Sequence, residues 1–146
     1  MALKLIAVPF GEAQDFVTVK HRHKAAPRGH KFPIGCLRRG ELVGVAIVGR
    51  PVAKGNQDGK TLEITRLASD GTRNVCSFLY GAARMSVFGN KYKRCITYTL
   101  KSESGVSLRA AGFVRVRDVR GGCWNRPSRP RDPQPIEDKV LWEAVA

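Results

Sequence analysis

The feature that most constrains the fold is one amphipathic helix set between two strand-like runs. Its apolar side chains recur at helical spacing, at Val75, Phe78, Leu79, Ala82 and Ala83. Gly89-Asn90 closes this pattern, and runs rich in strand-forming residues flank it at 61–67 and 95–100. A helix that joins two strands in this way packs on a sheet and buries its apolar stripe there.

Similar patterns extend over the rest of the chain. Further strands are predicted at residues 3–8, 32–37, 42–48, 113–119 and 140–145, and further helices at 11–20 and 106–111. The predicted order is therefore β-α-ββ-β-α-β-α-β-β. Hairpins combined with crossovers imply an α/β (α+β) fold with a mixed, mostly antiparallel central sheet flanked by helices. The 146 residues suit a single domain, 1–146.

Two strands carry finer expectations. Strict alternation in the 61–67 strand puts Leu62 on the face opposite Glu63 and Leu67. The 113–119 strand alternates apolar residues with arginines, which predicts a half-exposed strand.

The chain is strongly basic, with 26 Lys and Arg against 12 Asp and Glu and a formal net charge of +14. Such a field attracts nucleic acid, an anionic membrane or a phosphorylated cofactor, and a role in solubility alone is the alternative. The predicted nucleic-acid contacts lie in a polar loop over 21–31 and a Pro-rich segment over 125–135: Arg22, Lys24, Arg28, Lys31, Arg126, Arg129 and Arg131.

Cysteine usage and hydropathy exclude several classes of protein. The four cysteines, Cys36, Cys76, Cys95 and Cys123, form no CxxC pair and lie in or beside apolar runs, so buried thiols are expected rather than a disulfide framework. No stretch approaches the length of a membrane span, and the amino-terminal run lacks a signal-peptide cleavage site. The expected location is the cytoplasm, without a membrane partner. The oligomeric state stays open, with a dimer as one option.

All three histidines, His21, His23 and His30, lie close together in the polar loop. Three imidazoles can bind a transition metal, serve an acceptor site as a general base or phosphate contact, or belong to a solvated loop. Their spacing matches no strong zinc signature, so no metal site is predicted. His30 is a candidate catalytic residue.

The order of elements resembles that of the GNAT acyltransferase superfamily. The stretch ITYTLKSESGVSLRAAGF, from Ile96 to Phe113, is similar to the family's fifth strand, fourth helix and terminal Gly-Phe. The LEITRL run that begins at Leu62, followed by Asn74 and Ser77, adds to the likeness. The resemblance implies a CoA-dependent N-acyltransferase that uses acetyl-CoA or another acyl-CoA.

Two narrower likenesses point to phage proteins. The stretch from Ile96 also resembles part of Mom, the phage Mu DNA-modification protein, which implies DNA adenine modification. The chain further looks like a family of small uncharacterised phage and prophage proteins, through the sequences HRH at His21, GHKF at Gly29 and GVAIVGRP at Gly44. These likenesses imply a bacterial or phage-infected cell.

The GNAT resemblance assigns catalytic roles to particular residues. Glu63 lies on the strand where several GNAT enzymes place a carboxylate base, and its apolar or β-branched neighbours favour a raised pKa. An exposed carboxylate paired with a lysine is the alternative. Backbone N–H groups near Leu67 and Ala68 would hold the thioester carbonyl. Tyr98 and Ser102 are candidate donors to the leaving thiolate, with packing in the core as the alternative for Tyr98.

The loop over 69–77 is the predicted coenzyme site, because N–H groups at a helix start carry partial positive charge. Further donors for a diphosphate are Thr72, Arg73, Asn74 and Ser77, and the resemblance adds Ser107. An ordinary helix capped by Asp70 or Thr72 is the alternative. GNAT enzymes usually carry Arg/Gln-x-x-Gly-x-Gly/Ala here, whereas this loop lacks the expected glycines.

These observations predict a CoA-dependent N-acyltransferase that acts on an amine of a nucleobase or another polyanion-associated acceptor. The alternatives are Mom-like DNA adenine modification and a non-catalytic protein that binds nucleic acid or a host factor.

Overall fold

The computed structural model describes residues 2–21, 30–120 and 138–146. Its helices are α1 (Phe10–His21), α2 (Val75–Gly89) and α3 (Val106–Ala110), with a short 3-10 helix, η1 (Lys54–Asn56). Its strands are β1 (Lys4–Ala7), β2 (His30–Arg38), β3 (Glu41–Gly49), β4 (Thr61–Ser69), β5 (Arg94–Leu100), β6 (Val114–Val119) and β7 (Lys139–Val145). The predicted order of strands and α-helices is confirmed. Some bounds differ: β2 begins two residues early, β4 ends two residues late, and η1 lies where only a loop was expected.

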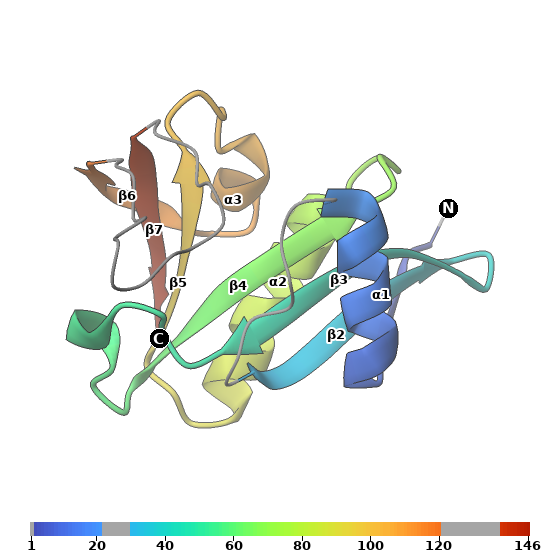
Figure 1. The fold of residues 1–146 in the computed structure, drawn as a ribbon, viewed down its shortest axis with the longest axis horizontal. Coiled ribbons are helices and arrows are strands. Elements are labelled where there is room, and N and C mark those ends of the chain that lie inside the picture. Colours follow the sequence, from blue (N-terminus) through green and yellow to red (C-terminus); the bar gives the residue numbers. More distant parts are fainter. Residues whose placement is uncertain (1, 22–29, 121–137) are drawn as a thin grey trace, which may run out of the picture.

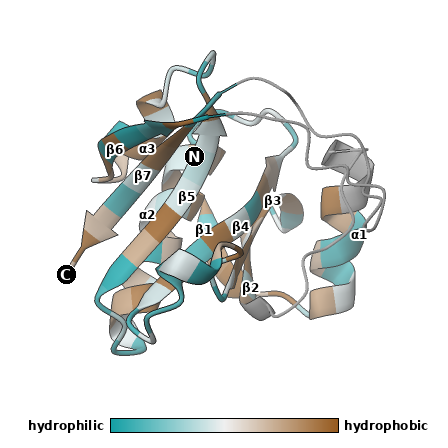
Figure 2. Ribbon diagram, turned by 60° about the vertical axis from the view of Figure 1, so that its left-hand side comes forward, coloured by the Kyte–Doolittle hydropathy of each residue, from teal (hydrophilic) through white to brown (hydrophobic). Residues whose placement is uncertain are grey.

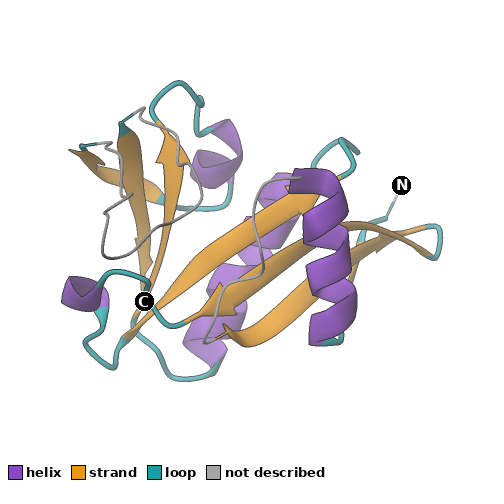
Figure 3. Ribbon diagram, viewed as in Figure 1, coloured by secondary structure: helices purple, strands orange, loops and turns teal. Residues whose placement is uncertain are grey.

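The seven strands form one sheet in the order β1-β2-β3-β4-β5-β7-β6 (Figure 1). Neighbouring strands are antiparallel except β4 and β5, which run parallel and are joined through α2. Helix α1 covers one face of the sheet and α2 the other (Figure 3). The mixed, mostly antiparallel α/β fold predicted from the sequence is therefore confirmed.

Each face of the sheet has its own apolar core. On the α1 face, Ala13 and Val17 of the helix pack with Val45, Ile47 and Ala68 of the strands. On the α2 face, the helix buries the stripe predicted by its periodicity, at Val75, Leu79, Ala83 and Val87. Burial of each large side chain of this kind contributes about 1.5–3 kcal/mol, so these two stripes fix both helices on the sheet.

Gly44 of β3 lets the first turn of α2 lie close to the sheet. A Cβ at this position would stand 2.4 Å from Cγ1 of Val75, 2.9 Å from Cδ1 of Leu79 and 3.2 Å from the carbonyl oxygen of Ala68. Such distances are shorter than van der Waals contact. The absent side chain therefore sets where the amino end of α2 sits relative to β4.

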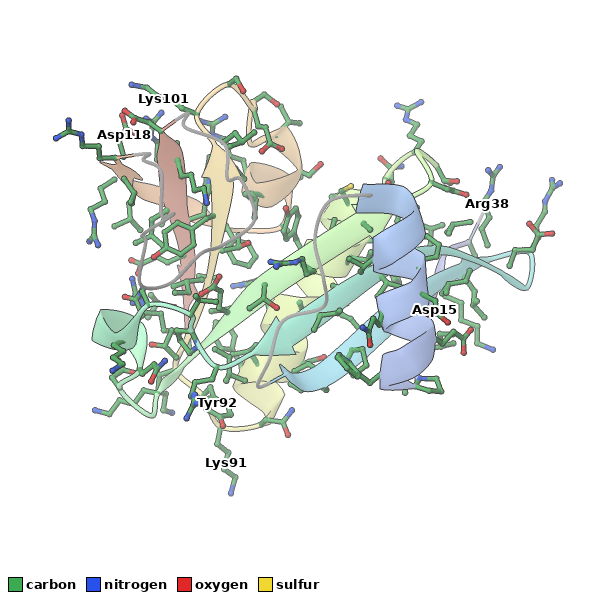
Figure 4. The ribbon with its side chains drawn as sticks, in the orientation of Figure 1. Asp15, Arg38, Lys91, Tyr92, Lys101 and Asp118 are labelled. Atoms are coloured by element: carbon green, nitrogen blue, oxygen red, sulfur yellow. The ribbon has the colours of Figure 1, made fainter. Side chains whose placement is uncertain are left out.

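Strand β6 is the outermost strand and is exposed on both faces, with Val114 and Val116 59% and 39% exposed. The prediction of a half-exposed strand is wrong, because an edge position leaves the apolar residues of β6 largely uncovered. Figure 2 shows β6 coloured by the hydropathy of its residues. Exposed ion pairs hold it: Asp118 contacts Arg115 and lies 3.3 Å from Nζ of Lys101 (Figure 4).

Three of the cysteines lie in the described ranges. Cys36 and Cys95 are buried and Cys76 is half-buried, and all three are free thiols. Cys123 lies outside the described residues. Within those same ranges, every helix is too short or too polar to cross a membrane.

Candidate functional site

The parallel strands β4 and β5 separate partway along their length. They pair at Thr61–Arg94, at Leu62–Cys95 and finally at Glu63–Ile96. Beyond this point β4 continues to Ser69 and β5 to Leu100, and Figure 1 shows the two strands diverging. The opening between residues 64–69 of β4 and 97–100 of β5 is called the fork below.

A buried side chain closes the base of the fork. Oγ1 of Thr97 donates a hydrogen bond of 3.0 Å to the carbonyl oxygen of Ile64. Ile64 is the first β4 residue beyond the paired positions. The threonine therefore supplies the partner that strand pairing no longer gives this carbonyl.

A β-bulge at Thr65 changes which face the later β4 residues occupy. Val48 pairs with Ile64 and the next position, Ile47, pairs with Arg66, so Thr65 is the extra residue. Oγ1 of Thr65 donates a 3.2 Å hydrogen bond to the carbonyl oxygen of Ile47. A bulge shifts the alternation of a strand by one position and bends it.

The predicted alternation of β4 is therefore wrong beyond Ile64. Leu67 packs into the same core as Leu62 and Ile64, on the α2 face, rather than sharing the face of Glu63. Arg66 and Ala68 instead lie on the α1 face, since Arg66 pairs with Ile47 and Ala68 joins the core under α1. The bulge thus brings an arginine to the same face as Glu63.

Glu63 is a buried carboxyl at the base of the fork, 6% exposed. Its Oε1 accepts a 3.1 Å hydrogen bond from the backbone N–H of Val52. Burial raises the pKa of Glu63 above its ordinary value, while the Val52 N–H and the charges of Arg66 and Lys139 act in the opposite direction. The observed site is not the exposed, lysine-paired carboxylate considered as the alternative.

Arg66 is half-buried close to Glu63. Its Nη1 donates a 2.6 Å hydrogen bond to the carbonyl oxygen of Thr65. Its Nε is buried and has no hydrogen-bond partner among the described residues. Burial lowers the pKa of Arg66, and the charge of Glu63 partly offsets this effect.

Thr97 and Thr99 of β5 lie on the α2 face, because their partners on β7 belong to the core under α2. Tyr98 alternates with them and therefore lies on the α1 face. Its hydroxyl accepts a 3.0 Å hydrogen bond from Nδ2 of Asn56, on η1. Tyr98 is half-buried rather than part of either core cluster. Ser102, the other candidate donor, is exposed in the turn after β5.

The loop before α2 is organised by its own side chains. Oδ1 of Asp70 accepts hydrogen bonds from the backbone N–H and the hydroxyl of Thr72, at 2.9 and 2.5 Å. The N-cap residue of α2 is Asn74, which makes no side-chain cap bond, so neither Asp70 nor Thr72 caps the helix. Asn74 has φ 69°, a left-handed conformation that asparagine adopts more readily than most residues.

Two hollows lie along α2. A cavity of about 170 Å³ lies between α2, the end of β5 and α3, with Cys76, Tyr80, Glu103 and Ser107 in its lining. A wider groove of about 720 Å³ runs between α2 and α3 and includes Ser77 and Arg84. The predicted coenzyme residues Ser77 and Ser107 therefore line different hollows.

Several predicted site residues fall outside the described residues. These are His23 and the cations Arg22, Lys24, Arg28, Arg126, Arg129 and Arg131. For His21, His30 and Lys31 only the backbone is described, at the end of α1 and the start of β2. Among the side chains that are described, no group of three His, Cys, Asp or Glu residues is arranged to hold a metal ion.

The structure also presents site residues that the sequence did not single out. Arg66, Thr97, Asn56 and Lys139 belong to this group. The bulge that directs Arg66 has no sequence signature, because it depends on pairing with β3. The loop that carries Asn56 folds so that this residue contacts Tyr98, which lies 42 positions later in the sequence.

No protein-family model matches the chain, and no curated protein matches its sequence. Solved structures match its fold over almost its whole length. An N-acetyltransferase from Staphylococcus aureus is 10% identical with a TM-score of 0.71, covering 99% of both chains. A Bacillus subtilis acetyltransferase in complex with CoA is 14% identical with a TM-score of 0.68, covering 99% of this chain and 97% of the other.

A GNAT family acetyltransferase from Elizabethkingia anophelis with acetyl-CoA bound is similar too. It is 12% identical with a TM-score of 0.67, covering 99% of this chain and 98% of the other. At such identities the likeness concerns the arrangement of the backbone. The chain has the fold of the GNAT acetyltransferases.

Proposed function

We propose that the protein is an acyl-CoA-dependent N-acyltransferase. The observation that carries this proposal is the fork between β4 and β5, with the buried carboxyl of Glu63 at its base. The fork opens toward α2 and α3, where a cavity of about 170 Å³ lies. The bound CoA and acetyl-CoA in two solved structures of the same fold support the choice of acyl donor.

The residues of the fork fit the demands of amine acylation. Acyl-CoA supplies an activated acyl group when bound, and an amine nitrogen must lose a proton to accept it. Glu63 is the proposed base, because a buried carboxyl with a raised pKa is matched to this task. Backbone N–H groups near Leu67 and Ala68 are the proposed donors to the thioester oxygen. Tyr98 and Ser102 remain the proposed donors to the thiolate.

The loop before α2 is the proposed diphosphate site. Thr72, Arg73, Asn74 and Ser77 belong to it, with Ser107 on α3 as a further contact. Gly71 and Asn74 both have positive φ, at 94° and 69°, so the loop turns its backbone sharply without the glycines usual in GNAT enzymes. The amino end of α2 follows directly, and its partial positive charge favours an anion.

Nucleic acid, or another polyanion that carries an amine, is the proposed acceptor. The net charge of +14 supports a phosphate-rich partner. The proposed contacts are Arg22, Lys24, Arg28, Lys31, Arg126, Arg129 and Arg131, and His30 is a proposed acceptor-side residue. DNA adenine modification of the Mom type is a narrower form of this proposal. Affinity for single- or double-stranded DNA should fall steeply with added salt, and a flat response would exclude phosphate contacts as the main source of binding.

A second candidate function is non-catalytic binding of nucleic acid or a host factor by a GNAT-like fold. The specific observation in its favour is that the Asp70 carboxylate occupies the N–H of Thr72. This negative charge lies in the loop where a diphosphate would have to bind. Acyl-CoA binding distinguishes the two candidates.

The direct experiment is thermal unfolding with and without acetyl-CoA. A ligand at about 100 times its Kd adds about 2.7 kcal/mol to the free energy of unfolding. For a domain of this size, that should raise Tm by roughly 5 °C or more. No change in Tm at millimolar acetyl-CoA would favour the non-catalytic candidate.

A further inference from the structure

Arg66 lies near the buried carboxyl of Glu63 but forms no ion pair with it within 4.0 Å. The bulge at Thr65 directs it to the α1 face of the sheet, on the β4 arm of the fork. Arg66 forms no ion pair within 4.0 Å with another described residue. Its Nε is buried without a hydrogen-bond partner in the same ranges.

This arrangement leaves the guanidinium group incompletely satisfied. Nη1 binds the carbonyl oxygen of Thr65, a neutral acceptor on its own strand. Glu63 is near enough to affect the pKa of Arg66, but its Oε1 already accepts the N–H of Val52. A half-buried guanidinium with an unpaired, buried N–H is destabilised, and its planar set of donors is well suited to a carboxylate or a phosphate.

A second cation lies on β7, next to the β5 arm of the fork. Lys139 begins β7 and pairs with Leu100, at the open end of β5. It alternates with Val140 and Trp142, which pack into the α2-face core, so Lys139 lies on the α1 face with Glu63 and Arg66. It is half-buried, and its charge acts on Glu63. Two cations on the α1 face therefore flank the fork beyond its base, Arg66 on β4 and Lys139 beside the end of β5.

We propose that Arg66 and Lys139 form a subsite for an oxyanion, a phosphate or carboxylate that the acceptor carries next to its amine. The inference rests on the proposed acyltransferase function and adds a substrate class to it. The anion binds between the two cations while the amine faces Glu63. This arrangement selects acceptors that hold a negative group close in space to the reacting nitrogen when bound.

The first test is anion binding, measured without any acyl donor. The protein is labelled with nitrogen-15, and the Nε–H signal of Arg66 is assigned by its loss in Arg66→Lys. Sodium phosphate, methyl phosphate and sodium acetate are titrated at constant ionic strength, with chloride as the reference. We expect the Arg66 signal to shift and saturate with at least one oxyanion. A signal that moves no more than it does in chloride overturns the inference.

The response to phosphate or to acetate identifies which oxyanion the subsite takes. Lys139→Gln should weaken binding of that anion several-fold. Arg117→Gln removes the same charge from the exposed edge strand β6 and should leave binding unchanged. Equal weakening by both variants would mean a general effect of net charge and would overturn the subsite.

A second test uses paired amines as acceptors. O-phosphoethanolamine is compared with ethanolamine, and β-alanine with propylamine, in acyl transfer from acetyl-CoA. Arg66→Gln also removes a charge that acts on Glu63, so both members can change, but KM should rise on the order of tenfold more for the anionic member of the preferred pair than for the neutral member. An equal change for both members would assign Arg66 a structural role only.

The two proposals fail in different ways. Acetyl-CoA that raises Tm together with an Arg66 signal indifferent to oxyanions would overturn the subsite alone. An Arg66 signal that responds to oxyanions without any binding of acetyl-CoA would overturn the acyltransferase and leave an anion-binding site on the α1 face.

Discussion

The hydroxyl of Thr97 donates a hydrogen bond of 3.0 Å to the carbonyl oxygen of Ile64, at the position where β4 and β5 stop pairing. Parallel strands that separate leave backbone groups without partners, and a buried carbonyl in that condition is destabilising. The Thr97 hydroxyl on β5 thus gives a hydrogen-bond partner to the first β4 carbonyl that lacks one after the strands separate. This hydrogen bond stabilises the separation of the two strands.

Replacement of Thr97 by valine keeps the shape of the side chain and removes the donor. Because the bond is buried, we expect a loss of about 1–3 kcal/mol in the free energy of unfolding. Urea unfolding measures this change. Thr97→Ser retains the hydroxyl and should keep more of the stability than the valine variant, and a valine variant as stable as the wild type would contradict this role.

Glu63→Gln should remove activity without unfolding the protein. An amide oxygen can still accept the N–H of Val52, whereas an amide cannot take a proton from an amine. We expect acyl transfer to fall about 100-fold or more. In the wild type the acid limb of the pH–rate profile should lie above pH 4.5, the ordinary pKa of a glutamic acid, because burial raises the pKa of Glu63.

Glu63 should also make the free energy of unfolding depend on pH. A carboxyl whose folded-state pKa is raised holds its proton more tightly in the folded than in the unfolded protein. The free energy of unfolding should therefore fall as pH rises from 4.5 through the raised pKa, and then level off. Glu63→Gln lacks this contribution, so its stability relative to the wild type should increase over that window. A difference that is independent of pH would show that the carboxyl titrates normally.

Arg73→Ala tests the proposed diphosphate site. Arg73 is exposed in the loop before α2, so its loss should cost little stability. We expect the Kd for CoA to rise on the order of tenfold, as is usual for a charge-assisted contact. Pantetheine lacks the diphosphate, and its weaker binding should be the same in both proteins. Calorimetric titration measures both ligands, and equal Kd values for CoA would exclude Arg73 from the site.

Two glycine substitutions test how closely α2 must approach the sheet. Gly44→Ala places a methyl group against Val75 and the Ala68 carbonyl, which should cost about 1–3 kcal/mol in stability and weaken CoA binding. Gly81→Ala, in the interior of α2, meets nothing within 4 Å and should stabilise the protein by about 0.5–1 kcal/mol. Equal effects of the two variants on unfolding would contradict the close approach at Gly44.

Local sequence patterns predicted the elements of this fold well. The stripe of α2 and the β-branched runs around it depend on short-range spacing, which a single sequence displays directly. The separation of β4 from β5 was not visible in the sequence, because it depends on which strands pair and where pairing ends.

The candidate site was less predictable than the fold. Glu63 stood out as a carboxylate among apolar residues, and its burial agrees with that expectation. Arg66 did not, since strict alternation along 61–67 would put it on the face of Leu62, and only the bulge at Thr65 turns it to the face of Glu63. Tyr98 acquired its hydrogen bond from Asn56 through a loop whose path the sequence does not encode in a recognisable motif.

The central claim, that the fork takes an acyl-CoA, is tested most directly by titrating the nitrogen-15-labelled protein with CoA and following the backbone amides. The account predicts saturable shifts at residues 66–77, around the end of β4 and the start of α2, and at 103–108, beside the cavity. Amides near Lys91, at the other end of α2 and far from this opening in Figure 4, should stay unchanged. Shifts confined to that basic end, or none at millimolar CoA, would contradict the claim.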